Sequence, residues 1–348
     1  MARILPAFAF IVVYALLSCV GQQRNSGSGQ HFTVDVLNGF TPVKNQGGGG
    51  VCWIYAMLAA IETEHIMRGD SVNLSPGFIV RRMLEEQYRR RVLTYGNSPV
   101  FDRATAPDLL RLVSLYGAMP FDSYSSVEGG DVPLHNTRVL ARKTKNIADR
   151  AVKRSLPPSK YEPLLATMLD ESLGTVPPHV YMLGAEYTAE EFGRSVCRQE
   201  EYEALTSFTH HPFGVDVDIE VPDNLNHNLF RNVPLDTLVA IVDRAVSAGH
   251  GVCWEGDISE PGFSFSRGIA KLKPGIDCSQ HQRQVMFERH ETTDDHCMSI
   301  VGMAHDSSNG RYYIMKNSWG TANPYGGLVY VSESYFRLKT VAVVLAKQ

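Results

Sequence analysis

Cysteine is scarce in this sequence, and its spacing excludes a common class of metal site. Only six cysteines occur in 348 residues, and no two of them form the C-x-x-C pair that structural zinc sites use. We therefore expect neither a metal ion nor another cofactor. Apart from the two cysteines discussed below, the thiols are scattered at Cys197, Cys253, Cys278 and Cys297. An exported protein could oxidise some of them, but the sequence does not pair them, and buried free thiols are the default interpretation.

A large excess of charge is absent as well. The formal net charge is −4, which gives no general attraction to nucleic acids or anionic membranes. One segment, 138–154, is rich in Arg and Lys. It could bind polyanions, but we favour a solvated helix face because few aromatic residues interleave with the charges. Nucleic acid is therefore not an expected partner.

The chain also lacks a long apolar run of the kind that spans a bilayer. Its most apolar stretch, Ile4 to Leu17, is too short for a comfortable membrane span but suits a secretory signal. The following Ser18-Cys19 completes a sequence that resembles a bacterial lipobox. We expect a lipoprotein signal peptide at 1–18, a lipid on Cys19, and a flexible tether at 19–31. The protein would then be exported and anchored in the bacterial cell envelope; the alternative is an ordinary cleaved signal.

Helical sequence patterns come first in the chain and strand patterns come later. Helices are expected at 53–62, 78–91, 107–116, 139–154 and 235–248. Short β-branched or aromatic segments, typical of strands, lie at 32–34, 251–254, 298–302, 312–315, 328–331 and 341–345. This order predicts an α+β fold with two segregated lobes. Within one domain at 32–348, we expect a helical lobe at about 43–230, a barrel-like lobe at about 232–348, and an active site at their seam.

Cys52 stands where a glycine run gives way to an apolar helix. The dipoles of a helix N-terminus lower the pKa of a thiol, and only the thiolate is a good nucleophile. The Cys52 backbone N–H could donate to an oxyanion, and the Gln46 amide could supply a second donor. Taken alone, such a cysteine is more often a buried cysteine at a helix start than a nucleophile. No Lys-Ser or Lys-Thr follows the glycines, which excludes a phosphate-binding loop.

Two later segments could complete a nucleophilic site. His296 opens an apolar strand and could pair with a thiolate at the seam. Asn317 begins the sequence N-S-W-G and could accept a hydrogen bond from the imidazole, with the indole of Trp319 shielding that bond from water. Taken alone, a histidine before a strand is more often structural, and N-S-W-G could be a tight turn.

In this order, the segments resemble the papain family of cysteine peptidases. The family pattern is Q-G-x-C-G-S-C-W, then a histidine that opens a strand, then N-S-W-G. This chain has Gln46-Gly47, Cys52-Trp53, Asp295-His296 and Asn317-Ser318-Trp319-Gly320. The resemblance implies a papain-like fold that hydrolyses peptides or proteins.

The resemblance also implies a mechanism through a thioester intermediate. Cys52 would be the nucleophile, and Gln46 would help to hold the oxyanion. His296 would protonate the departing amine and then activate water, while Asn317 would keep its ring in register. Trp53, Asp295 and Trp319 would support these four residues.

The sequence departs from papain itself at two points. Gly49 stands where papain has a disulfide cysteine, so that bridge is absent. The sequence separation between Cys52 and His296 is far larger than the ~130–150 residues typical of papain and cathepsins, so a long insertion must occupy the helical half. A long insertion in the helical half is similar to that of the bleomycin hydrolase, or aminopeptidase C, branch. Four segments resemble the same branch: 74–76, 116–120, 251–254 and 292–296.

The resemblance leaves the type of peptidase open. In that branch, a C-terminal carboxylate enters the cleft and anchors the free amine of the substrate. Here three residues follow the last expected strand, and three residues span at most ~10 Å. We therefore expect an aminopeptidase preference that is weak or depends on another acidic group. The alternatives are an inactive surface lipoprotein that binds peptides in the same cleft and a polyanion-binding protein. The oligomeric state is open, a homo-oligomer included.

Overall fold

The computed structural model describes residues 30–124, 136–182 and 184–347. The expected signal peptide, Cys19 and nearly all of the expected tether lie outside these ranges. Within them, no helix combines the length and the apolar character needed to cross a membrane.

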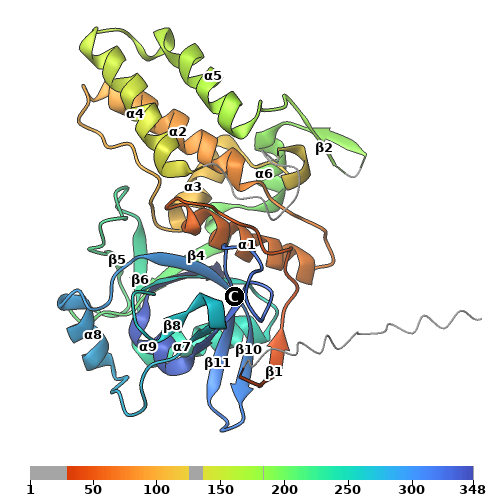
Figure 1. Cartoon of the computed structure of the whole chain (residues 1–348), viewed down its shortest axis with the longest axis vertical. Helices are drawn as coiled ribbons and strands as arrows, with labels where there is room; N and C mark the ends of the chain where they lie inside the picture. Colours follow the sequence, from red (N-terminus) through yellow and green to blue (C-terminus); the bar gives the residue numbers. More distant parts are fainter. Residues whose placement is uncertain (1–29, 125–135, 183, 348) are drawn as a thin grey trace, which may run out of the picture.

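Helices form one end of the molecule, drawn at the top of Figure 1. Their bounds are α2 Pro76–Leu93, α3 Pro107–Tyr116, α4 Thr137–Lys153, α5 Glu162–Leu173 and α6 Ala189–Val196. These bounds confirm the helices expected at 78–91, 107–116 and 139–154. α7, Leu235–Ser247, lies with the sheet at the other end and confirms the helix expected at 235–248.

The basic segment 138–154 coincides with α4, which is amphipathic. Its apolar face, including Leu140 and Ile147, is buried, while Arg142 and Lys143 are exposed on the other face. Asp149 on the same helix pairs with Lys145 at 2.7 Å and with Arg91 of α2 at 2.6 Å. The charges therefore cover the outside of a packed helix, as the sequence suggested.

The other end of the molecule is built on a large mixed sheet. The order of its strands is β5-β6-β4-β13-β7-β10-β11-β12-β9-β8, with β1 paired to β10. Their bounds are β1 Phe32–Leu37, β4 Tyr202–Thr206, β5 Asp216–Asp218, β6 Leu229–Asn232, β7 Val252–Gly256, β8 Phe263–Ser264, β9 Ile269–Ala270, β10 His296–Asp306, β11 Arg311–Lys316, β12 Leu328–Ser332 and β13 Thr340–Ala346. β2 Val180–Met182 and β3 Ala185–Tyr187 form a separate hairpin, while the short helices α8 Gln280–Glu288 and α9 Glu333–Lys339 flank the large sheet.

Two expectations about this sheet need correction. Within the described ranges no ladder joins β5 to β8, so the expected barrel-like lobe is an open sheet rather than a closed barrel. The sheet also begins before residue 232, because it includes β4 at 202–206. The final strand β13 pairs with β4 on one edge and with β7 on the other. A buried final strand needs partners on both edges, and residues 202–206, assigned to the helical lobe from sequence, supply one of them.

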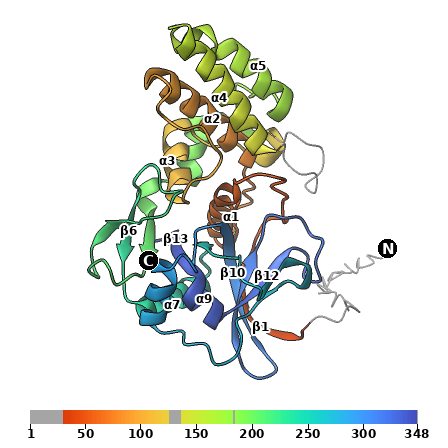
Figure 2. The same cartoon turned by 60° about the vertical axis from the view of Figure 1, so that its left-hand side comes forward.

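α1, Cys52–Met67, lies between the two ends of the molecule (Figure 2). Its residues from Cys52 to His65 are all buried, as expected of a helix that is apolar nearly all round. Strands β7 and β10 pack against it closely. A side chain at Gly251, just before β7, would meet the Ala60 carbonyl oxygen at 2.8 Å. The N-terminus of α1 is thereby held at the junction between the helices and the sheet.

Candidate active site

Cys52 is the first residue of α1 and follows a tightly packed glycine loop, 47–50. Gly47 has a φ of +67°, a conformation that other residues rarely adopt. A side chain at Gly49 would come within 1.8 Å of the Thr137 hydroxyl oxygen on α4. Only glycine therefore fits at position 49. The disulfide that papain forms at this position is absent here.

Asp102, which the sequence analysis did not identify, fixes this loop to the helices. Its carboxylate accepts hydrogen bonds from the Gly50 backbone N–H at 2.7 Å and from the Thr137 hydroxyl at 2.5 Å. Its backbone carbonyl accepts one from the Trp53 indole at 3.1 Å. Trp53 thus supports the site by holding the first turn of α1 against residue 102. Only the tertiary structure brings Asp102 to the loop, since no spacing rule connects the two.

His296 is the first residue of β10 and lies beside Cys52. Its Nε2–H donates to Asn317 Oδ1 at 2.8 Å, because an amide oxygen can only accept. This bond leaves Nδ1 free to interact with the Cys52 sulfur. Burial alone would lower the pKa of His296, but the contact with Cys52 and the Asn317 bond raise it. Both contacts therefore favour the protonated, proton-donating form of the ring.

Trp319 and Asp295 take different positions around this histidine. The Trp319 ring lies 4.6 Å from the His296 ring, between centroids, and covers it. Asp295 points elsewhere, since its carboxylate accepts from the Ile258 backbone N–H at 2.9 Å. Burial raises the pKa of Asp295 to about 6. Its role is to fix the turn after β7, next to the start of β10.

Gln46 is buried at the other side of the glycine loop. Its side-chain oxygen accepts from the Ser318 hydroxyl at 2.5 Å, and its Nε2 donates to the Gly49 carbonyl at 2.9 Å. An amide nitrogen carries two hydrogens, so one N–H of Gln46 remains for another acceptor. Through Ser318, the segment that holds Gln46 is joined directly to the one that holds Asn317.

Cys297, the residue after His296, is a neighbour of Cys52 that the motif search passed over. Its interaction with the Cys52 sulfur is the largest cause that lowers the pKa of Cys52. Burial opposes the shift, and His296 adds to it through a hydrogen bond and its positive charge. The balance favours a thiolate at Cys52 paired with an imidazolium at His296. All five described cysteines are free.

A buried charge cluster ties the segments of the site together. Glu62, on α1, accepts from Lys44 at 2.9 Å and from the Leu74 backbone N–H at 2.7 Å. Lys316 Nζ lies 3.6 Å from the same carboxylate, and the Thr41 hydroxyl also donates to it. Lys44 and Lys316 lie close in sequence to Gln46 and Asn317. The signal for this cluster was a carboxylate inside an apolar helix, because a buried carboxylate must find a partner.

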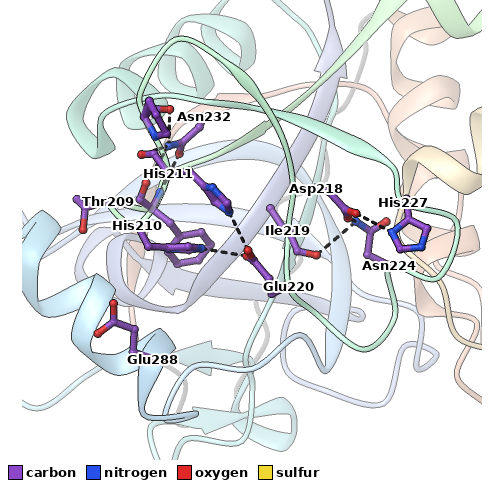
Figure 3. Close-up of polar contacts among 12 residues, drawn as sticks. Thr209, His210, His211, Asp218, Ile219, Glu220, Asn224, His227, Asn232 and Glu288 are labelled. Carbon is purple, nitrogen blue, oxygen red and sulfur yellow. Dashed lines mark hydrogen bonds and ion pairs between the residues drawn. The ribbon is translucent and has the colours of Figure 1, made fainter.

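His210, His211 and His227 lie near acidic side chains (Figure 3). His210 and His211 both point at Glu220, at 3.0 and 2.9 Å, and these three residues could hold a metal ion. Gln284 Nε2, however, donates to His210 Nδ1 at 2.9 Å. A neutral His210 must then carry its proton on Nε2, the atom that faces Glu220, and this disfavours coordination by it. His227 pairs separately with Asp218 at 2.6 Å.

Neither known family profiles nor curated proteins match this chain, but solved structures do. PepW from Lactobacillus rhamnosis HN001 has a TM-score of 0.67 at 16% identity, covering 90% of this chain and 82% of PepW. Digestive procathepsin L 3 of Tenebrio molitor has a TM-score of 0.43 at 16% identity, with coverages of 92% and 72%. Bromelain from Ananas comosus with the E64 inhibitor has a TM-score of 0.40 at 13% identity, with coverages of 89% and 94%. The chain therefore has the papain-like α+β fold, with Cys52, His296 and Asn317 at the junction of its two ends.

Proposed function

We propose that this protein is a cysteine peptidase that cleaves peptide bonds through a thioester at Cys52. The observation that carries the proposal is the chain of contacts from Cys52 to His296 to Asn317, three residues from distant segments, on a papain-like fold. A thiol with a lowered pKa next to a protonated imidazole has the properties of an activated nucleophile.

In this mechanism the Cys52 thiolate attacks the carbonyl carbon of the scissile bond. The Cys52 backbone N–H and the remaining N–H of Gln46 would stabilise the oxyanion. His296 gives its proton to the departing amine and then takes one from the water that hydrolyses the thioester. The Asn317 bond holds the imidazole in the tautomer that both steps need.

We further propose that the chain belongs to the bleomycin hydrolase, or aminopeptidase C, branch. The motifs of the sequence support this assignment, as do the helices α4 to α6, which lie in the long segment between Cys52 and His296. The likeness to PepW extends over this segment, since it covers 90% of the chain.

Hydrolysis of a fluorogenic peptide library tests the activity, with Cys52→Ala as the inactive control. We expect turnover by the native protein, none by the variant, and a covalent adduct on Cys52 with an epoxide inhibitor of papain-type enzymes. Peptide binding without turnover or an adduct would instead support an inactive peptide-binding protein. Salt-sensitive polyanion binding that survives the loss of Cys52 would support the other alternative.

Export and a lipid on Cys19 form a separate proposal, supported by the apolar segment and the lipobox-like sequence. The native protein should then partition with membranes and detergent, and Cys19→Ala should prevent acylation. A soluble mature protein without acyl mass would indicate an ordinary cleaved signal.

A further inference from the structure

A cavity of about 830 Å³ is lined by residues 292–294, which immediately precede the segment that carries His296. Asp294, two residues before His296, forms part of its wall together with Arg103. The cavity also contains the carboxylates of Glu220, Asp223 and Glu288. Its volume is in the range that holds a substrate group or small ligand, and it carries more acidic than permanently basic side chains.

Most of these carboxylates already have partners. Glu220 accepts from His210 and His211 (Figure 3). Asp223 pairs with Arg103 Nε at 2.6 Å, and Glu288 accepts from Gln284 at 2.8 Å. These three carboxylates therefore already accept hydrogen bonds from other side chains.

Asp294 is the exception. Among the described residues no group donates a hydrogen bond to its carboxylate, although Arg103 Nη2 donates to its backbone carbonyl at 2.6 Å. Its carboxylate, one of Glu255 and the Cys297 sulfur have ligand atoms within 4.8 Å of one another. Glu255 is fully buried. Its Oε1 accepts from the Ala106 backbone N–H, but its Oε2 has no hydrogen-bond partner among the described residues. Asp294 thus joins the cavity wall to a second, buried carboxyl group and to Cys297, which contacts Cys52.

The pKa values of Asp294 and Glu255 show that neither carboxyl group has enough positive charge beside it. Burial raises the pKa of Asp294, and the nearby Glu255 raises it further. Burial raises the pKa of Glu255 to about 8, with a contribution from the charge of Cys52. The free site therefore holds more acidic groups than its cations can stabilise in the ionised form. A cation that enters the cavity would supply the absent charge and hydrogen-bond donors.

We propose that Asp294, backed by Glu255, binds a positively charged group of the peptide substrate close to the scissile bond. This inference rests on the proposed peptidase function. The group is an ammonium or guanidinium, whose N–H donors suit two carboxyl acceptors. It can come from a lysine or arginine side chain or from the free N-terminus of the substrate. The cavity is far larger than a single metal ion, and this favours the charged end of a longer group.

Four matched peptides separate the two sources. They carry lysine or norleucine in the two residues before the scissile bond, and each has a free or an acetylated N-terminus. We expect a charged peptide to exceed its neutral match by at least about tenfold in kcat/KM, given the strength of desolvated charge pairs. A difference in kcat/KM between the lysine and norleucine peptides identifies a side-chain site. A difference between the free and acetylated peptides identifies an N-terminal site. Equal kcat/KM for all four peptides would overturn the proposal.

The variant Asp294→Asn keeps the size of the side chain but removes its charge. It should bring the charged-to-neutral ratio close to one, and Glu255→Gln should lower the ratio as an independent check. Glu171→Gln, which removes an exposed carboxylate on α5, is the matched control and should keep the native ratio. A native ratio in Asp294→Asn would contradict the assignment.

Binding experiments keep this inference separate from the proposed function. If the native protein hydrolyses none of the peptides, peptidase activity is refuted, and the same four peptides are then titrated into it. Tighter binding of the charged peptides that is lost in Asp294→Asn would still support the cation site. Stoichiometric Zn²⁺ binding that Asp294→Asn abolishes, without discrimination among the peptides, would overturn the proposal in favour of a metal site.

Discussion

Replacing Glu62 by Gln tests whether the buried charge cluster holds the candidate active site together. The native carboxylate is fully buried and is the anion that Lys44 and Lys316 share; their side chains are 10% and 5% exposed. Gln keeps the size and one acceptor but removes the charge. Two ammonium groups would then remain in the interior without an anion.

The expected cost is about 3–5 kcal/mol, the usual result of removing one partner from a buried ion pair. This is a large part of the 5–15 kcal/mol that typically separates folded from unfolded protein. The thermal midpoint should fall by about 4–7 °C for a chain of this length. Activity should fall as well, because Lys44 and Lys316 fix the segments that carry Gln46 and Asn317.

The pH dependence of the loss gives a second measure. Lys316 has a pKa lowered by burial to about 8, although Glu62 opposes that shift. Without Glu62, its folded-state pKa should fall further below the unfolded value of ~10.4. The unfolded state then binds more protons at intermediate pH, so the variant should gain stability as pH rises from 7 to 9. The deficit relative to the native protein should therefore be smaller at pH 9.

Calorimetric or denaturant unfolding of the variant measures both effects. Lys316→Met in the Glu62→Gln background should recover part of the loss, because it removes one unpaired charge. Glu171→Gln makes the same chemical change at an exposed position and should leave the midpoint near the native value. A loss below about 1 kcal/mol, typical of surface ion pairs, would refute the role assigned to the cluster.

Three further predictions concern the catalytic geometry. Gln46→Ala should lower kcat by about 10²–10³-fold with a smaller change in KM, the usual loss of one oxyanion donor; an unchanged kcat would exclude it from the oxyanion site. Cys297→Ala removes the strongest stabilisation of the Cys52 thiolate. The acid limbs of two pH profiles, that of kcat/KM and that of the rate of alkylation by iodoacetamide, should therefore move to higher pH. A limb that stays in place would disprove that contact. Asp102→Ala leaves the Gly50 N–H and the Thr137 hydroxyl without an acceptor and should cost about 2–4 kcal/mol in urea unfolding. Asp102→Asn, which keeps one acceptor oxygen, should cost less.

Sequence patterns predicted the helices best where the residue pattern was clear. The helix at Cys52 was evident because it is apolar on every side. α4 was evident because its charged residues lie on one face. The strands 202–206 and 216–218 were not evident. They are short, with five and three residues, and the strand 202–206 pairs with β13 from the far end of the chain. The expected barrel failed for the same reason, since closure depends on which edges meet.

The sequence by itself determined the papain-like motifs and their order, from Gln46 to Asn317. Such motifs are local, because each residue type carries its chemistry wherever the chain places it. The tertiary structure alone decided which other groups meet them. Cys297 reaches Cys52, Asp102 reaches the glycine loop, and Asp294 and Glu255 come together next to a cavity. These contacts join residues that no spacing rule connects, because burial and charge act through distance in space rather than position along the chain.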